Sequence, residues 1–512
     1  MERIAQKVER NQRWLLLSLL AVFLWGILAH GYGFMHSSFS HDSLNEFNGA
    51  NGGDAWKIQL GRFVIPAYKA VFRTDLTLPW LVGILSLLWI GLSVFLVIRI
   101  FKIESRLLVF LIAGIFTANI TVAATSATYM HDFDCDMFAL LCSVLAVHFW
   151  KNVRGGGGTF GAIFVAISLG IYQSYLSVTI VLVMFVCILD LLGEKGFKSV
   201  LAAGLKAVGM LLLGCVIYYA VMRLVLSLTG IELASGDSNN LDKMLELTPR
   251  SILSLIYCAY QDCYSRLVSA VSPYPAGLVK GATWVMLLMA AGALLAGLWN
   301  KRLSALDKLL CVGLVALLPL GMNLMYVLTG GVVHDLMVYA VWLFYLLVLL
   351  LLNRWHFPKS RMLKGLCMAL IFVLLYGNVQ TANALYLKKD MEQKAFLSLM
   401  TRVVYRMEEC NEYEPGKTPV VFVGNSDQLN ETIPGFEKYR RITGAGDARS
   451  ANMPEDFRSR TYFQYVLNNP ALIASGSVWE EMQTDPRVSE MPSYPSDGCI
   501  AMLDGVLVVK LG

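Results

Sequence analysis

Acidic and basic side chains are concentrated in one segment near the N-terminus, His36 to Phe63, which reads HSSFSHDSLNEFNGANGGDAWKIQLGRF. In it, Asp42 and Glu46 are followed by Lys57 and Arg62. A carboxylate can take the proton of a hydroxyl group as its oxygen attacks. Arginine and lysine can stabilise the charge that collects on a departing phosphate. The segment therefore has the residue types needed to transfer a group from a phosphate to a hydroxyl.

Histidine and aspartate recur as neighbours at three places in the chain. The three pairs are His41-Asp42, His131-Asp132 and His334-Asp335. The second pair begins the stretch HDFDCDMF, in which Asp134 and Asp136 crowd the start of an apolar run. Acidic groups at a hydrocarbon boundary are costly unless they face an aqueous cavity, which makes them functional candidates. The alternative is that they are solvated loop acids without a shared site.

The elements that must position these residues are membrane helices. Hydrophobic residues make up 56% of the 512 and charged residues 15%, and the mean hydropathy is +0.57, which is more apolar surface than a soluble domain needs. A bilayer core of roughly 30 Å requires about 20 apolar residues per helix. The first run lacks an A-x-A-like cleavage site, so we interpret it as a span. The predicted spans are Trp14–Phe34, Leu78–Ile100, Leu107–Ala124, Met137–Trp150, Val200–Leu226, Val279–Trp299, Leu306–Leu328, Leu336–Leu352 and Leu363–Ala384.

A further apolar segment, Thr159 to Gly193, decides the topology because it is too long for one upright span. A single helix there would place most later lysines and arginines outside, against the positive-inside bias. We therefore predict a hairpin of two short helices with Tyr172 and Gln173 at its outer tip. This predicts about eleven transmembrane helices in a mainly α, multi-pass protein, with the N-terminus cytoplasmic. The outer loops are then 35–77, 125–136 and 227–278.

The last polar region, 388–512, is predicted to be a small extracytoplasmic α/β domain that follows a membrane domain at 1–387. Thr418 to Gln428 reads as a strand and turn, and Asp504-Gly505 between two apolar runs is a hairpin signal. This compartment is oxidising, so a disulfide between Cys410 and Cys499 is expected. Two unrelated thiols are the alternative.

The outer segment 227–278 contains a predicted surface helix. Thr248-Pro249 is a helix-start signal, and apolar residues follow at helical spacing. Such a helix would lie along the bilayer, with Arg250 and Arg266 near headgroup height.

Several of these features together resemble a known family. They are the acidic loop after the first span, the GRF segment (Gly61 to Phe63), the HDFDCDMFALL stretch, and SLGIYQSYLSV (Ser168 to Val178) with its Tyr-Gln pair inside a short hairpin. Over residues 10 to 385 the chain resembles the bacterial GtrII-type glucosyltransferases, O-antigen-modifying membrane enzymes of the GT-C fold.

The resemblance implies a hexosyltransferase of the bacterial cytoplasmic membrane. Its donor would be undecaprenyl-phosphate-linked glucose or a related polyprenyl-phosphate sugar. Its acceptor would be a cell-surface glycan such as the O-antigen of lipopolysaccharide. A flippase and a polyprenyl-phosphate sugar synthase would belong to the same pathway, and nothing points to nucleic acid. Some GT-C enzymes use a divalent ion, which leaves Mg²⁺ or Mn²⁺ open as a cofactor.

GT-C enzymes place a catalytic aspartate in the first outer loop, which by position is Asp42. Many relatives have two adjacent acids there, whereas this chain has His41-Asp42. His41 is then a spectator, a metal ligand or a hydrogen-bond partner of the acceptor. Asp132, and second Asp134, would position the acceptor or orient the donor sugar.

The remaining candidates would bind the donor or line the cavity. Arg62 and Lys57 would hold the donor phosphate, with Arg250 or Arg266 as auxiliaries; lipid-headgroup contact is the alternative for Arg62. The predicted cavity-lining residues are His41, Glu46, His131, Tyr172, Gln173 and His334. Helix packing is the alternative for Tyr172 and Gln173, and a buried structural role for His334.

Two other classes of protein share some of these features. A transporter of lipid-linked sugar would have similar apolar bulk, but it would not need acids on one side, and the halves show no repeat. A metal-dependent transferase of phosphorylated groups would use the His-Asp pairs as zinc or manganese ligands. No serine or threonine nucleophile stands in a recognisable setting for it.

Overall fold

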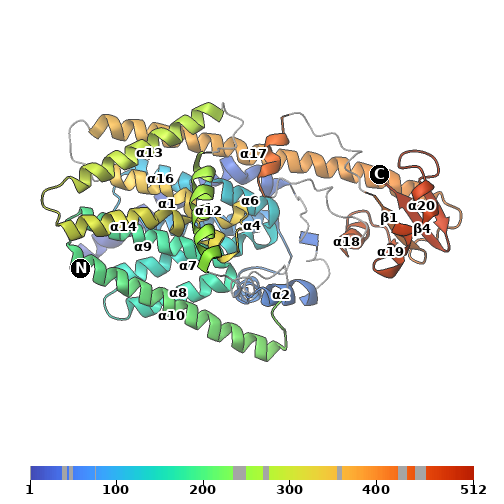
Figure 1. The fold of residues 1–512 in the computed structure, drawn as a ribbon, viewed down its shortest axis with the longest axis horizontal. Coiled ribbons are helices and arrows are strands. Elements are labelled where there is room, and N and C mark those ends of the chain that lie inside the picture. Colours follow the sequence, from blue (N-terminus) through green and yellow to red (C-terminus); the bar gives the residue numbers. More distant parts are fainter. Residues whose placement is uncertain are drawn as a thin grey trace.

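The protein is a bundle of long helices with a small α/β domain at one end (Figure 1). The structure is a computed structural model that describes residues 2–36, 43–44, 50–74, 76–234, 249–268, 276–353, 360–424, 435–443 and 457–512. The first half of the bundle contains α1 (Glu2–Met35), α2 (Ala50–Gln59), α3 (Val64–Phe72), α4 (Pro79–Phe101), α5 (Arg106–Thr117), α6 (Ile120–Thr128), η2 (Met130–Asp132), α7 (Phe133–Asn152), α8 (Gly157–Ile171), η3 (Gln173–Tyr175), α9 (Leu176–Leu192) and α10 (Phe197–Thr229). The second half contains α12 (Pro249–Val268), α13 (Ala276–Leu298), α14 (Ala305–Met322), α15 (Leu324–Leu328), η5 (Asp335–Met337), α16 (Tyr339–Asn353) and α17 (Ser360–Glu408).

Eight helices within the described residues are long and apolar enough to cross a membrane, or nine if the bent pair α5 and α6 forms one span. α8 and α16 are apolar but shorter. The predicted total of about eleven is reached only if the bent pair and both shorter helices cross as well, so this number is not confirmed. The multi-pass, mainly helical architecture is as expected.

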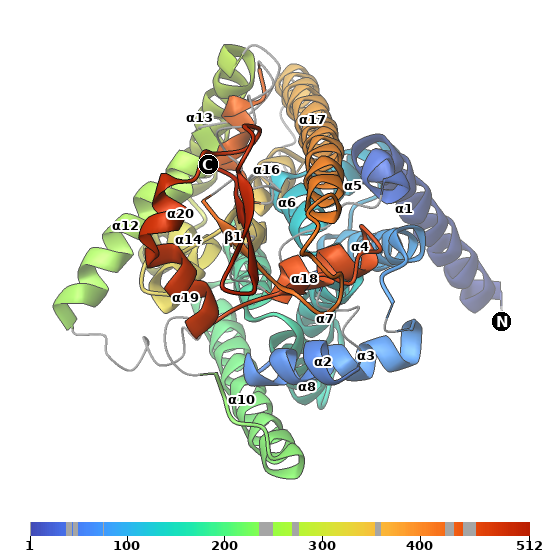
Figure 2. The same ribbon diagram turned by 90° about the vertical axis from the view of Figure 1, so that its right-hand side faces the viewer.

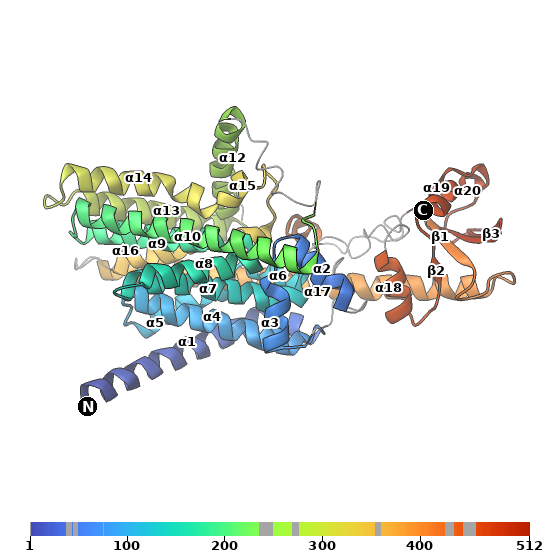
Figure 3. The ribbon, with the colours of Figure 1, turned by 90° about the horizontal axis from the view of Figure 1, so that it is seen from below.

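The ambiguous segment 159–193 forms two helices, as predicted. α8 ends at Ile171, the short η3 follows, and α9 begins at Leu176. Figure 3 shows α8, α9 and α10 side by side in the bundle. Tyr172 has extended backbone angles that end α8, so the Tyr-Gln pair lies at the break between the two helices.

The predicted surface helix begins at Pro249, as its start signal indicated, and ends at Val268. Figures 1 and 3 show that this helix, α12, crosses the long helices instead of running along them. It is not among the helices apolar enough to span a membrane. The position of α12 along the bilayer surface stays a prediction.

One continuous helix, α17, leads from the bundle into the C-terminal domain (Figures 1 and 3). It has 49 residues and is about 74 Å long at 1.5 Å per residue, so the predicted boundary at residue 387/388 falls inside it. The domain has a four-stranded sheet in the order β2-β1-β4-β3. Its elements are β1 (Pro419–Val423), η7 (Glu437–Arg441), α18 (Phe457–Tyr465), β2 (Leu472–Ile473), α19 (Ser477–Thr484), α20 (Pro486–Glu490), β3 (Ile500–Leu503) and β4 (Val506–Lys510).

The sheet follows the sequence signals closely. β1 pairs in parallel with β2 and β4, whereas β3 and β4 form an antiparallel hairpin. Asp504 and Gly505 both have positive φ, as a two-residue type I′ turn requires. The predicted Cys410–Cys499 disulfide is not formed, since both are free thiols. They pack on the same hydrophobic core, but the Cys499 sulfur lies 3.7 Å from a guanidinium nitrogen of Arg406 instead.

Candidate active site

Charged side chains gather at the end of the bundle that faces the C-terminal domain. Figure 2 looks onto this end, where α2 and α3 lie across the bundle. Seven lysine, arginine, histidine or aspartate side chains in residues 57–73 and 131–136 are less than 10% exposed, and we call them the charged cluster. They are Lys57, Lys69, Arg73, His131, Asp132, Asp134 and Asp136.

Asp132 lies between two lysines that come from different helices. The ammonium group of Lys57, on α2, donates a hydrogen bond to Asp132, and that of Lys69, on α3, lies 3.1 Å from its other oxygen. His131 Nε2 is 3.5 Å from the same carboxylate. Both oxygens of Asp132 therefore face cations, although Oδ1 accepts no hydrogen bond from a described residue. This geometry suits holding α2 and α3 in place better than accepting a proton.

Asp134 forms a second buried ion pair, with Arg73 at the end of α3. The Nε–Oδ2 distance is 3.0 Å, and neither side chain has exposed surface. Arg73 also donates to the backbone carbonyl of His131. Tyr68 accepts a hydrogen bond from Trp89 Nε1 at 2.7 Å, and burial, together with the Asp134 carboxylate, raises the pKa of Tyr68. Asp134 thus joins α3 to α7, and its side chain has no exposed surface that a substrate could contact.

Arg62 differs from the other cations because its hydrogen-bonding groups are not all in use. Its guanidinium lies 4.6 Å from the ring centre of Tyr172. Its buried Nε has no hydrogen-bond partner among the described residues. A cation with an unused donor over an aromatic ring is suited to an anionic group.

The turn that presents Arg62 is held by the break between α8 and α9. Gln173 Nε2 donates to the Leu60 carbonyl at 3.3 Å and to the Tyr218 hydroxyl at 3.2 Å. The Tyr218 hydroxyl in turn donates to the Gly61 carbonyl at 3.2 Å. Gly61 has a φ of +73°, which glycine adopts readily. The structure therefore brings the predicted residues Tyr172 and Gln173 against the Lys57–Arg62 segment.

Asp136 is the third acid of the HDFDCDMF stretch and lies one helical turn beyond Asp132. It is 6% exposed, and within the described part of the chain it forms no hydrogen bond or ion pair. The cations that act on it electrostatically are Arg62 and Lys57. Asp136 and Arg62 are thus the members of this region whose charges are not bonded to a partner.

The predicted base, Asp42, lies outside the described residues, as do His41 and Glu46. Leu44, two positions after Asp42, is described and only 6% exposed. It belongs to the hydrophobic core of the C-terminal domain, together with Phe396 of α17. The first loop is therefore anchored in that domain close to Asp42.

Arg266 takes part in a separate network on α12. It lies 2.6 Å from Asp262 and 2.6 Å from Asp335, and donates to the Val333 carbonyl at 3.1 Å. The same Asp335 carboxylate accepts a hydrogen bond from the backbone N–H of Thr443, beyond η7. All three guanidinium nitrogens are engaged, so Arg266 fixes α12 to η5 and the C-terminal chain.

Two other predicted residues add little to the site. His334 is exposed, and its neighbour Asp335 makes the contacts. Arg250 lies in the first turn of α12, but its side chain is outside the described part. No group of three or more metal-ligating side chains occurs among the described residues. The two described His-Asp pairs have different protein partners. Asp132 contacts Lys57 and Lys69, whereas Asp335 contacts Arg266.

Lys69 and Arg73 are site residues that the sequence reasoning missed. Their spacing of four places both on one face of α3, and two cations in the apolar stretch VIPAYKAVFR were the available signal. They contact Asp132 and Asp134, which are spaced by two on η2 and α7. Only tertiary packing reveals this pairing.

The family model for glucosyl transferase GtrII matches residues 31–352, well over half of the chain. The chain belongs to the GtrII glucosyl transferase family. No curated protein matches it. No solved structure matches it either. The region of the GtrII match contains the first loop, the charged cluster, the α8–α9 break and the α12 network, whereas α17 and the C-terminal domain follow it. The charged cluster therefore lies within the matched part of the chain.

Proposed function

We propose that this GtrII glucosyl transferase moves glucose from a polyprenyl-phosphate carrier to a hydroxyl group of a cell-surface glycan such as O-antigen. The reaction would take place at the outer face of the bacterial cytoplasmic membrane, with eleven crossings, a cytoplasmic N-terminus and the C-terminal domain outside. The observation that carries the proposal is the family match, joined to a set of buried acids and cations at one end of the bundle. A lipid-linked donor fits this setting because it stays in the bilayer.

Transfer requires one bond to form and one to break. The acceptor oxygen attacks the anomeric carbon of the sugar, and the bond between that carbon and the phosphate oxygen breaks. We assign the proton of the acceptor hydroxyl to the carboxylate of Asp42. The polyprenyl phosphate leaves with the bonding electron pair, and a cation beside it lowers the barrier.

Arg62 is the phosphate-binding cation in this proposal. Its Nε is buried without a partner in the described part of the chain, and Tyr172 supports its guanidinium. Lys57 and Lys69 are bonded to Asp132, so we assign them to shaping the site. Asp136 lies near Arg62 and would orient the guanidinium or a sugar hydroxyl.

The C-terminal domain has a positioning role in this proposal. Leu44 is buried in its core, and only one residue separates it from Asp42. Anchoring a loop reduces the conformational freedom lost when the acceptor binds. The domain would therefore hold the base in position over the donor sugar.

The test is sugar transfer by the purified protein. Synthetic polyprenyl-phosphate glucose would serve as donor, and a glycan from cells lacking the gene as acceptor. Asp42→Asn should reduce transfer by roughly 10²- to 10⁴-fold while donor binding persists. Glu232→Gln removes an exposed carboxylate just beyond α10 and should leave transfer unchanged. If the native protein transfers no sugar but moves labelled lipid-linked sugar between vesicle leaflets, it is a transporter and the proposal fails.

A further inference from the structure

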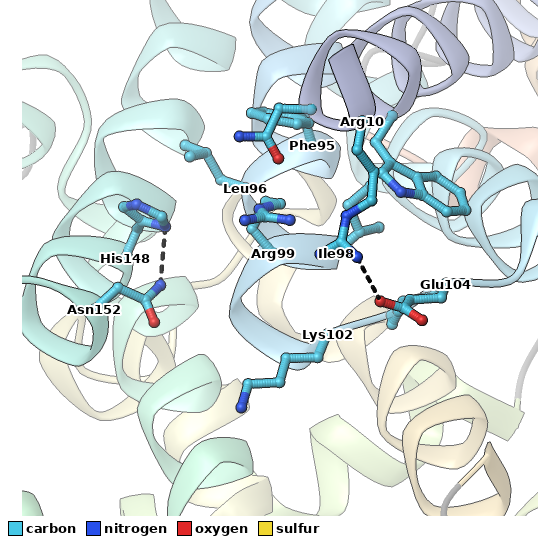
Figure 4. Close-up of a pocket in the computed structure, with 12 residues that line it drawn as sticks. Arg10, Phe95, Leu96, Ile98, Arg99, Lys102, Glu104, His148 and Asn152 are labelled. Atoms are coloured by element: carbon cyan, nitrogen blue, oxygen red, sulfur yellow. Dashed lines mark hydrogen bonds and ion pairs between the residues drawn. The ribbon is translucent and has the colours of Figure 1, made fainter. Parts of the chain in front are cut away.

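A second polar site lies at the opposite end of the bundle, where α1, α4 and α7 meet (Figure 4). It is a cavity of about 590 Å³, which we call the basic pocket. The side chains that matter below are Arg10, Trp14, Arg99, Lys102, Glu104 and His148. None of them belongs to the charged cluster or to the proposed glycosyl transfer.

The charges of the basic pocket are not balanced. Glu104 is its only acid, and it lies 3.8 Å from Arg10, with both side chains more than half exposed. Arg99 and Lys102 form no side-chain hydrogen bond or ion pair with any described residue. Arg99 is half-buried and lies near His148, whereas Lys102 is exposed. Figure 4 shows Arg99 between His148 and Arg10. The pocket therefore has two cations without a counter-charge among the residues that the structure describes.

The part of the basic pocket one helical turn further into α1 and α4 is apolar. Trp14 and the α4 side chains Phe95 and Leu96 line it, and each is half-buried. The membrane-spanning part of α1 begins at Glu9, and α4 ends at Phe101. Arg10, Trp14, Arg99 and Lys102 thus lie where two spans reach the bilayer surface. A ligand here meets cations near the helix ends and apolar side chains one turn further into the bundle.

We propose that the basic pocket binds the phosphate headgroup of an anionic glycerophospholipid. Basic pockets between transmembrane helices are suited to lipid headgroups, and the guanidinium of Arg99 can bond two phosphate oxygens at once. The apolar part favours a lipid over free phosphate because it accepts the first carbons of an acyl chain. In the proposed orientation this lipid belongs to the cytoplasmic leaflet, where polyprenyl-phosphate glucose is not used as donor.

The test is lipid binding by full-length protein in detergent, counted by native mass spectrometry. The protein would be titrated with phosphatidylglycerol and, separately, with phosphatidylcholine. The native chain should retain one phosphatidylglycerol in preference to phosphatidylcholine. Arg99→Gln with Lys102→Asn should weaken that binding roughly 30-fold. Lys198→Gln with Lys301→Gln is the matched control, since it removes two exposed positive charges at the same end of the bundle but outside the pocket.

Two further measurements complete the test, one with a single variant and one with competing ligands. Lys102→Asn alone guards against misfolding, because Lys102 has a φ of +55° that asparagine tolerates; it should weaken binding several-fold. Undecaprenyl phosphate and inorganic phosphate would be tested as competitors. Equal loss in the pocket and control variants overturns the proposal. Binding of phosphatidylcholine as tight as phosphatidylglycerol, or preference for either competitor, overturns it as well.

Discussion

The two ends of α7 balance their charges in different ways. At its beginning, Asp132 and Asp134 are buried and bonded to cations from α2 and α3. At its other end, His148 lines a pocket where Arg99 and Lys102 have no counter-charge among the described residues, and the only ion pair, Arg10 with Glu104, is largely exposed. At the first end most buried charges are paired within the protein, with Arg62 and Asp136 as the exceptions, whereas the other end leaves positive charge to a ligand or to solvent.

This difference shows what each end can be used for. A buried charge must be paired, because an unpaired one is strongly unfavourable in a low-dielectric setting. The paired residues at the beginning of α7 therefore form a scaffold. Arg62 and Asp136 have no such partner among the described residues, so they are the groups that a bound substrate would pair. At the exposed end water can solvate the cations, so leaving Arg99 and Lys102 unpaired destabilises the fold little when no anion is bound. The comparison makes predictions about stability as well as about ligands.

The largest effect is expected from breaking the Arg73–Asp134 pair. Arg73→Met leaves the Asp134 carboxylate buried without its cation, which should lower the free energy of unfolding by about 3–5 kcal/mol. The measurement is unfolding of the purified protein in mixed micelles. Adding Asp134→Leu should recover much of the loss, because an apolar pair can replace a buried ion pair. A loss below about 1 kcal/mol for Arg73→Met would mean that the Asp134 carboxylate does not depend on Arg73 as its counter-charge.

The sequence was sufficient for features that depend on local chemistry. The lengths of apolar runs predicted the membrane helices. The length of 159–193 and the positive-inside bias predicted two helices there, and the polar pair predicted the position of the break between α8 and α9. Pro249 predicted the start of α12. Asp504-Gly505 predicted the hairpin, because few residue pairs adopt positive φ at both positions.

Partners distant in the chain could not be predicted in this way. Asp132, Lys57 and Arg62 were recognised as candidates, but the bonds of Asp132 to Lys57 and Lys69 join residues more than sixty positions apart. Arg266 was assigned to a phosphate because Asp335, 69 positions away, was not known to face it. The disulfide prediction failed since it rested on the expected compartment and not on geometry.

Removing the unpaired cation at the beginning of α7 should affect transfer more than folding. Arg62→Gln deletes a charge-assisted contact to the donor phosphate, and we expect kcat/KM for the polyprenyl-phosphate sugar to fall roughly 10- to 100-fold. Arg62→Lys keeps the charge but not the planar fork, so it should restore only part of the activity. Thermal unfolding serves as the control and should change little. If both variants lose stability and keep their kinetics, Arg62 belongs to the scaffold.

The turn before Arg62 offers a smaller effect. A Cβ at position 61 would lie 2.5 Å from the Tyr218 hydroxyl, in a backbone conformation with a φ of +73°. Gly61→Ala should therefore destabilise the protein by about 1–2 kcal/mol and displace Arg62, which lowers transfer. Tyr218→Phe removes the clashing oxygen, so Gly61→Ala should be less harmful in that background. Equal losses in both backgrounds would assign the whole effect to backbone strain.

The smallest effect is expected at the far end of α7, and it completes the comparison. Arg10 and Glu104 form an ion pair at 3.8 Å whose side chains are 59% and 70% exposed. Exposed pairs contribute little because water screens them and two long side chains lose conformational freedom. Arg10→Gln should change the free energy of unfolding by less than about 0.5 kcal/mol, measured in the same micelles as Arg73→Met. A change of several kcal/mol would show that the basic pocket is part of the folded core and that its charges are balanced by the protein after all.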